Sequence, residues 1–352
     1  MTALVVKQHN PPNAEPDLAQ LIQYAHTPEH LVYLRNHDDE ENAHEGYLLT
    51  VDGAVETPFK ISLSELSQLP QTTVEAVLQC AGNRRSMMPA STDGIQWGAG
   101  TVANCLWSGV ALSTLLERAG VRSSVPAQHV HFAAERGPVQ EERFYAGSVP
   151  LDKGLKDVLL ATHMNGKKLT REHGAPLRVV VPGYCGARWV KWVTHIHLSP
   201  HESANHYMQR DYKVLPPSSG EEAENGGHWD NEEPITEMPL NSAIASISAS
   251  TVKGYALPGP GDKGSISRVE VSLDDGSTWS DALITYRGGR WGWVLWEYQF
   301  HTGSDRDGTR KVKGVALSRA VDEEGKTQPR EGTWNLRGVC YDGYGRMEYS
   351  LE

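Results

Sequence analysis

The stretch Leu78-Gln79-Cys80-Ala81-Gly82-Asn83-Arg84-Arg85 places a single cysteine between a strand-like segment and a pair of arginines. Residues 73–80 alternate in polarity, which predicts a strand that ends at Cys80. The small residues that follow predict a turn, and the guanidinium groups beyond it favour the thiolate form of the cysteine. A thiolate in such a place suits a nucleophile or a ligand for a soft metal. A buried structural cysteine beside a surface arginine pair explains the same residues equally well.

The segments around this stretch, to about residue 200, mix short strands and helices without a regular βαβ repeat. Residues 47–51 and 59–61 predict strands, and Ser62 and Glu65 have the spacing of a capping box at the start of a helix. Residues 111–119 carry apolar side chains on one helical stripe. Buried strands are expected at 129–132 and 178–181. This pattern predicts an α+β domain.

The character of the sequence changes after a segment rich in proline, glycine and acidic residues at 216–239, which predicts a linker. Residues 265–273, 291–300 and 311–321 then alternate with period two between turn signals, and no helical pattern follows. An all-β sandwich is therefore expected. The predicted organisation is an N-terminal, loosely held arm (1–30), a catalytic domain (31–214), a linker (215–240) and a β-sandwich domain (241–352).

Composition limits the class of function. The chain has 352 residues and a net charge of −11, which argues against a non-specific nucleic-acid binder. No apolar run approaches the length of a membrane span and no secretory signal opens the chain, so a soluble, intracellular, by default cytoplasmic enzyme is expected. The four cysteines lie far apart without a C-x-x-C pair, which argues against a zinc finger or an iron–sulfur cluster. An anionic substrate would need a local cluster of arginines to overcome the overall negative field.

The string from Leu78 to Ser86 resembles the molybdenum-binding signature of the sulfite oxidase family, which also contains assimilatory nitrate reductases. Further segments resemble that family in the same order along the chain, from about residue 31 to the end. In the first domain these are residues 34–37, with an R-N-H element, 173–183, with the H-G-x-P-x-R-V-V-V-P-G run, 186–188, 190–192 and 209–213. In the β-rich part, residues 266–272, 275–279 and 334–338 are similar to the family's dimerisation domain.

The resemblance implies a molybdopterin-binding domain with the sulfite oxidase fold, followed by an immunoglobulin-like sandwich. It implies molybdenum and molybdopterin as cofactors, without haem or flavin, and Cys80 as the protein ligand of the metal. The residues implied to face a small oxyanion are Arg35, Arg85, Arg268, Trp97 and Tyr212. Those implied to hold the pterin and its phosphate are Asn36, His37, Glu135, His173, Arg178, Trp189, Val190 and Lys191.

Five of these positions carry alternatives. Tyr212 could be an edge aromatic, and Trp97 could be only a wall of the pocket. Trp189 stands where the family usually has histidine, and Glu135 is one carbon longer than the family's usual aspartate. Arg268 shares a strand face with Glu270, so a surface salt bridge is its ordinary alternative role. Outside the resemblance, His195 and His197 lie on one side of an expected strand and could bind a metal, although such pairs are usually ordinary surface or core residues.

The implied reaction is oxygen-atom transfer that oxidises sulfite to sulfate, with electrons passing to dioxygen or to a separate acceptor such as a cytochrome. The arginines would supply positioning and charge neutralisation, and residues 241–352 would form a homodimer. The alternatives are a nitrate reductase module, an enzyme for another small oxyanion or a sulfoxide, and a non-catalytic binding protein. Nitrate reductases of this family carry haem and flavin domains that this sequence lacks, and Ser86-Met87-Met88 is closer to the sulfite branch.

Overall fold

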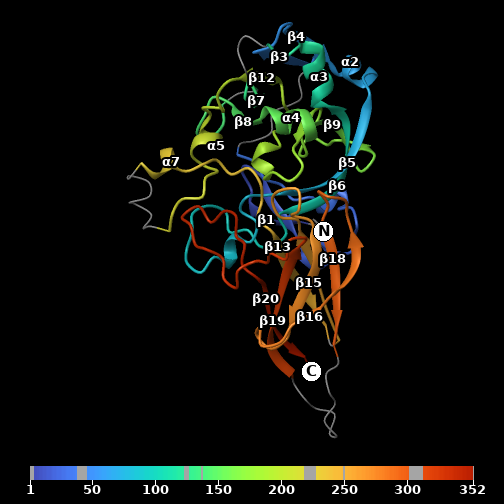
Figure 1. Cartoon of the computed structure of the whole chain (residues 1–352), viewed down its shortest axis with the longest axis vertical. Coiled ribbons are helices and arrows are strands. Elements are labelled where there is room, and N and C mark those ends of the chain that lie inside the picture. Colours follow the sequence, from blue (N-terminus) through green and yellow to red (C-terminus); the bar gives the residue numbers. More distant parts are fainter. Residues whose placement is uncertain are drawn as a thin grey trace.

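The computed structural model of the chain describes residues 4–37, 46–122, 127–135, 138–217, 227–248, 250–300 and 312–351. Figure 1 shows a mixed α/β body at one end and an elongated β-sandwich at the other, with the N-terminal hairpin between them. The expected fold class, an α+β domain followed by an all-β domain, is confirmed. None of the described helices is long and apolar enough to cross a membrane.

The α/β body contains two five-stranded sheets. In the first, strands run in the order β10-β9-β6-β5 and β11 also pairs with β9. In the second, the order is β4-β3-β12-β7-β8. The strands of this body are β3 (Leu48–Gly53), β4 (Phe59–Ser62), β5 (Gln71–Gln79), β6 (Val102–Ala111), β7 (His129–Ala134), β8 (Tyr145–Pro150), β9 (Leu159–Met164), β10 (Lys167–Lys168), β11 (Arg178–Val180) and β12 (His195–Ser199).

Short helices connect and flank these strands. The expected capping box is present, because the Ser62 side chain accepts from the backbone N–H of Glu65 while the Glu65 carboxylate accepts from that of Ser62. The helices are α1 (Leu18–Leu21), α2 (Leu63–Gln68), α3 (Leu112–Ala119), α4 (Leu151–Asp157), α5 (His206–Gln209) and α7 (His228–Asn231), with 3-10 turns η1 (Glu29–Leu31), η2 (Arg85–Met87) and η3 (Gly186–Arg188).

The β-sandwich consists of two antiparallel four-stranded sheets, β13-β14-β18-β17 and β16-β15-β19-β20. Their inward-facing apolar side chains, including Val252, Val269 and Trp296, form one cluster between the sheets. The strands are β13 (Asn241–Ile247), β14 (Thr251–Leu257), β15 (Ile266–Ser272), β16 (Ser280–Asp281), β17 (Leu283–Arg287), β18 (Val294–Gln299), β19 (Val312–Asp322) and β20 (Gly345–Leu351).

The two bodies share buried contacts. Val77 and Val102 of the α/β body pack in one apolar cluster with Tyr255 and Trp293 of the sandwich. Arg84 is fully buried in this junction. Its guanidinium donates to Asn241 Oδ1 at 2.6 Å and to the carbonyls of Ser242, Gly343 and Tyr344. Arg84 therefore links the turn that follows β5 to the sandwich through hydrogen bonds.

The N-terminal segment is packed more firmly than its composition predicts. Strands β1 (Leu4–Gln8) and β2 (Asn13–Pro16) form a hairpin, and every residue of β2 is buried. The Glu15 carboxylate accepts from the backbone N–H groups of Gly98 and Gly100, and Asn13 binds the backbone of Asn36. The expectation of a loosely held arm is wrong for these residues, because long-range partners satisfy polar groups that look solvent-facing in sequence.

The linker is partly folded onto the α/β body. Ile235 and Met238 are buried against Tyr207 and Tyr212, and the Arg188 guanidinium donates to the Ile235 carbonyl at 2.9 Å. Residues 218–226 of the expected linker lie outside the described part of the chain.

Candidate active site

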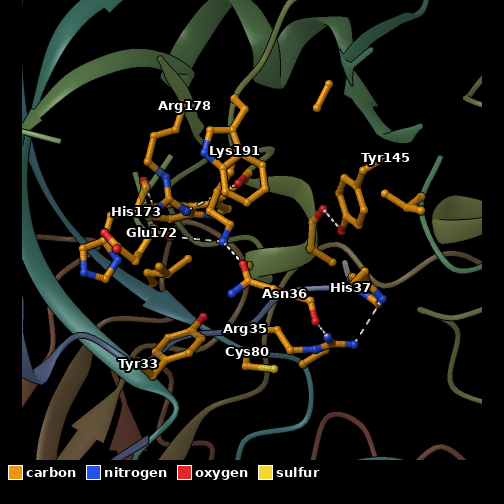
Figure 2. A pocket seen from close by; sticks show the side chains of 18 of the residues that line it. Tyr33, Arg35, Asn36, His37, Cys80, Tyr145, Glu172, His173, Arg178 and Lys191 are labelled. Atoms are coloured by element: carbon orange, nitrogen blue, oxygen red, sulfur yellow. Dashed lines mark hydrogen bonds between the residues drawn. The ribbon is translucent and has the colours of Figure 1, made fainter. Parts of the chain in front are cut away.

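A cavity of about 220 Å³ lies where β5 ends, and Cys80 is one of the residues in its wall. Its lining combines a thiol, several cationic side chains and aromatic rings from segments far apart in sequence. The polar and aromatic residues that line it include Tyr33, Arg35, Asn36, His37, Cys80, Tyr145, Glu172, His173, Arg178, Trp189, Lys191, Trp192 and Tyr212 (Figure 2).

The turn after β5 holds the sulfur of Cys80 at the cavity. The Cys80 backbone N–H donates to the Thr101 carbonyl at 3.0 Å, and the Gly82 N–H points at Sγ from 3.4 Å. A β-carbon at Gly82 would lie 2.8 Å from Arg85 Nη2 and 3.0 Å from Trp97 Cδ1, so only glycine fits between these side chains. Cys80 as a whole residue is 7% exposed, and it lines the cavity.

Arg35, His37 and Tyr212 form a hydrogen-bonded row beside this sulfur. Arg35 Nη2 donates to His37 Nδ1 at 3.2 Å, and His37 Nε2 lies 2.7 Å from the Tyr212 hydroxyl. Burial lowers the pKa of His37 well below its ordinary value, and the Arg35 charge adds to that effect, so the ring is neutral. Because arginine can only donate, Nδ1 is the acceptor and the single ring proton is on Nε2.

This tautomer determines what the Tyr212 hydroxyl can do. Its oxygen accepts from His37 Nε2, so its own hydrogen remains available as a donor to a group bound in the cavity. Burial raises the pKa of Tyr212 to about 12, although the Arg35 charge opposes this shift, and the phenol stays protonated near neutral pH. Arg35 and Tyr212 are thus two hydrogen-bond donors in the wall of the cavity that Cys80 also lines.

The other end of the cavity is cationic. Arg178 is buried between the rings of Trp107 and Trp189 and donates to the His173 carbonyl at 3.0 Å. Among the described residues it has no carboxylate partner, and its Nε is buried without a hydrogen-bond acceptor. Burial lowers the Arg178 pKa to about 10, which still leaves the group charged. A buried cation with an unused donor is a place for an anion.

Lys191, Asn36 and His173 join the two ends. The Lys191 ammonium donates to Asn36 Oδ1 and, at 3.1 Å, to the Glu172 carbonyl (Figure 2). Burial lowers the pKa of His173 to about 4, and the charges of Arg178 and Lys191 add to that effect. His173 is therefore a neutral imidazole that can exchange hydrogen bonds with a bound group.

Two of the predicted oxyanion residues, Arg85 and Trp97, lie next to the turn after β5 but outside the lining of the cavity. Arg85 donates to the carbonyls of Gly338 and Ile95, and Trp97 is buried in the core with its carbonyl bound to the Ser86 N–H. Burial lowers the Arg85 pKa, and the charge of Arg35 adds to this effect although Cys80 opposes it. Neither Arg85 nor Trp97 is among the described residues that line the cavity.

Arg268 is not brought to this site. It lies on β15 with its side chain 48% exposed, and its guanidinium is 2.7 Å from the Glu270 carboxylate. The surface salt bridge that was the alternative is the arrangement found, because the side chain leaves the sheet on its solvent face. The prediction that Arg268 contacts the substrate is therefore wrong.

Glu135, Val190 and Trp189 are the remaining predicted pterin residues. Glu135 lines a separate pocket and is 3.4 Å from His195 Nδ1. Val190 is buried, and its carbonyl accepts from the Val179 N–H. Trp189 does line the cavity, but its indole N–H donates to the Tyr184 carbonyl at 3.0 Å and is not available to a ligand.

Sequence reasoning missed Arg337. Its guanidinium donates to Asp211 Oδ1 at 2.8 Å, next to Tyr212. Its charge contributes to the lowered pKa values of His37 and Arg85, after burial and Arg35. Arg337 therefore supplies, near Arg35 and Arg85, the third positive charge that was assigned to Arg268. The segment 334–338 was recognised only as part of the β-domain resemblance, and nothing local in it indicates that a loop of the sandwich lies against Arg85 and Asp211.

Comparisons with known proteins cover almost the whole chain. Residues 36–207 match the family described as "Oxidoreductase molybdopterin binding domain", and residues 232–351 match the "Mo-co oxidoreductase dimerisation domain". The chain is 35% identical to a sulfite oxidase of Arabidopsis thaliana, and the alignment covers 98% of this chain and 93% of that protein.

Other relatives differ in name and in length. The chain is 34% identical to a mitochondrial sulfite oxidase of Drosophila melanogaster, of which it spans 62%. It is 36% identical to an NADH nitrate reductase of Ulva prolifera, of which it spans 42%. Each of these two alignments covers 97% of this chain. Among solved structures, the sulfane dehydrogenase SoxCD from Paracoccus pantotrophus is similar with a TM-score of 0.78 and 27% identity, covering 98% of this chain and 86% of that one.

Proposed function

Because the chain belongs to the sulfite oxidase family of molybdopterin oxidoreductases, we propose that it oxidises sulfite to sulfate at the Cys80 cavity. The observation that carries the proposal is the Cys80 thiol in the wall of a cavity that the donors Arg35 and Tyr212 also line. Guanidinium and phenol donors match the oxygens of a small oxyanion.

The residues of the cavity fit a molybdenum cofactor. Cys80 offers a soft thiolate ligand, and Arg178 offers a buried cation with an unused Nε donor for the phosphate of the pterin. Lys191, Asn36 and His173 lie between these two ends and would hold the pterin itself. When bound, the cofactor supplies the two-electron redox chemistry of the reaction.

The contribution of the chain is binding, orientation and charge. Arg35, helped by Arg85 and Arg337, provides a local positive field in a protein of net charge −11. Tyr212 donates its hydroxyl hydrogen to the oxyanion, and His37 keeps that hydroxyl oriented through Nε2. Burial of these groups strengthens each interaction with an anion because little water competes.

The overall reaction requires an electron acceptor. Sulfite and one water give sulfate, two protons and two electrons. We propose that the electrons pass to dioxygen, giving hydrogen peroxide, or to a separate acceptor protein. Nitrate reduction is the second candidate, because identity to the nitrate reductase of Ulva prolifera is as high as identity to the sulfite oxidases. Alignment with nearly the full length of a protein named sulfite oxidase favours sulfite.

The test is steady-state turnover of purified, molybdenum-loaded protein. Sulfite is supplied with dioxygen or with ferricyanide, and nitrate with reduced viologen dye, after metal analysis has shown one molybdenum per chain. Sulfite-dependent peroxide release or ferricyanide reduction is expected. Nitrate turnover with no sulfite turnover would replace the proposal by the second candidate, and no turnover with either at full loading would refute both.

A pair of cysteine variants ties the activity to the cavity. Cys80→Ser should abolish sulfite turnover, while Cys105→Ser should leave it near the wild-type value. Cys105 is a buried core thiol that contacts the Thr27 carbonyl at 3.7 Å, so a hydroxyl there has a hydrogen-bond acceptor. Turnover by the Cys80 variant would contradict the assignment.

We also propose that the chain forms a homodimer through residues 241–352, which is supported by the match of residues 232–351 to a dimerisation domain. Light scattering coupled to size-exclusion chromatography should give twice the mass of one chain. A monomer at micromolar concentration would contradict this proposal.

A further inference from the structure

Strand β12 presents two histidines on the side of its sheet that faces away from the α/β core. Ile196 and Leu198 are fully buried in that core, so His195 and His197, which alternate with them, project from the opposite face. They line a second pocket that is separate from the Cys80 cavity. The catalytic proposal uses neither histidine.

The sheet register brings an aspartate to the same face. Asp52 on β3 lies directly opposite His197 on β12, and both strands run parallel. Gly53, with φ +86°, lets β3 approach β12, since a β-carbon there would lie 2.2 Å from the Leu198 carbonyl oxygen. His131 on β7 lies opposite His197 on the other side.

Ligand atoms of three residues converge at this point. Asp52 Oδ1 is 2.7 Å from His197 Nδ1, and Asp52 Oδ2 is 2.9 Å from His195 Nε2. All three residues offer ligand atoms within 4.8 Å of one another. The cluster therefore contains one carboxylate and two imidazoles.

His195 is oriented as a metal ligand usually is. Its Nδ1 faces the Glu135 carboxylate at 3.4 Å, so a metal bound at Nε2 would leave the ring proton on Nδ1, opposite that carboxylate. The Nε2 atom is buried and lies 2.9 Å from Asp52 Oδ2. A metal ion bound between this nitrogen and the carboxylate would take the place of the ring proton on Nε2.

We propose that Asp52, His195 and His197 form a binding site for a divalent transition-metal ion of the zinc type, with Glu135 orienting His195. Zinc at about 2.0–2.1 Å from each ligand in tetrahedral geometry needs ligand atoms about 3.3 Å apart. The ligand atoms of the three residues lie within 4.8 Å of one another, so side-chain movements of about 1 Å would bring them to that spacing. Two imidazoles and one carboxylate leave the fourth position to water from the pocket.

The site is tested with cofactor-loaded protein that has been treated with EDTA and then titrated with zinc chloride in a calorimeter. One zinc per chain is expected. X-ray absorption of the zinc-loaded protein should show only nitrogen and oxygen neighbours at about 2.0–2.1 Å, whereas binding at a cysteine would add sulfur at about 2.3 Å. A sulfur shell, or no binding at 100-fold molar excess, would overturn the proposal.

Variants locate the ion within the protein. His195→Ala and His197→Ala should each weaken zinc binding at least tenfold, and Glu135→Gln should weaken it by about tenfold because it acts through His195. His131→Gln is the matched control. It lies in the same cross-strand row, but its Nε2 is already bound to the His201 carbonyl at 2.8 Å, so zinc affinity should be unchanged.

The two alanine variants can overturn the proposal, and a crystal of the wild-type protein replaces them if they do not fold. Wild-type affinity in both alanine variants would overturn the proposal and would leave the cluster as a set of histidine–carboxylate ion pairs. If a variant fails to fold, the anomalous zinc signal in crystals of the wild-type protein decides the question. A peak between Asp52 and the two imidazoles supports the site, and a peak elsewhere refutes it.

Discussion

Replacing Arg337 by methionine should weaken sulfite turnover far more than the same replacement at Arg268. Arg337 donates to Asp211 beside Tyr212 and its charge acts on His37 and Arg85, whereas Arg268 is held by Glu270 on the solvent face of β15. Methionine keeps most of the side-chain length and removes the charge. The two variants therefore compare the position that the structure favours with the one that the sequence favoured.

The magnitude follows from the surroundings of each guanidinium. A hydrogen bond from a charged group contributes about 1.5–3 kcal/mol, which corresponds to roughly 10- to 150-fold in kcat/KM. Asp211 already neutralises part of the Arg337 charge, and the Arg337 side chain is 30% exposed. The lower part of that range is therefore expected. The exposed pair of Arg268 is worth about 0–1 kcal/mol of stability and nothing in catalysis.

The assay is ferricyanide reduction over a range of sulfite concentrations, with molybdenum content measured for each variant. Arg337→Met should raise KM about tenfold or more, Arg337→Lys should recover part of the loss, and Arg268→Met should match the wild type. Asp211 keeps His206 as a second partner at 3.3 Å, which limits damage to the fold. Unchanged kinetics for Arg337→Met, or an equal loss for Arg268→Met, would refute the reasoning.

Three further predictions follow from the buried polar groups. Tyr212→Phe should lower kcat/KM for sulfite by about 10- to 100-fold at unchanged molybdenum content, because one donor to the oxyanion is lost; loss of molybdenum instead would give the tyrosine a cofactor role. The pKa of His173 is about 4 in the folded state and about 6.5 in the unfolded state. Above pH 6.5 the group therefore does not change the free energy of unfolding, and as the pH falls from 6.5 toward 4 it lowers that free energy. The cofactor-free protein should lose up to roughly 3 kcal/mol from this group, measured by urea unfolding, and His173→Gln should remove that share of the slope. Arg84→Met should lower the free energy of unfolding by at least about 3 kcal/mol, because it leaves Asn241 and several carbonyls buried without a donor, and a change below about 1 kcal/mol in urea titration would contradict the structural role given to Arg84.

Local patterns determined much of the architecture. The alternation that leads to Cys80, the capping box at Ser62 and the period-two segments after residue 240 each depend on near neighbours, and each formed as expected. The motif around Cys80 likewise identified the family, because the turn after a strand has to be built from the residues adjacent to the thiol.

Only the tertiary structure decided which distant side chains meet. Arg268 and Arg337 are both arginines in β-domain motifs, and no local pattern tells which one contacts Asp211, the neighbour of the cavity residue Tyr212. The choice is made by a loop of the sandwich that lies against Arg85 and Asp211, and that contact depends on packing between two bodies. The meeting of Asp52 with His195 and His197 has the same origin, since strand register joins residues more than 140 positions apart. Sequence patterns report the period of one element, whereas a site is defined by distances between elements.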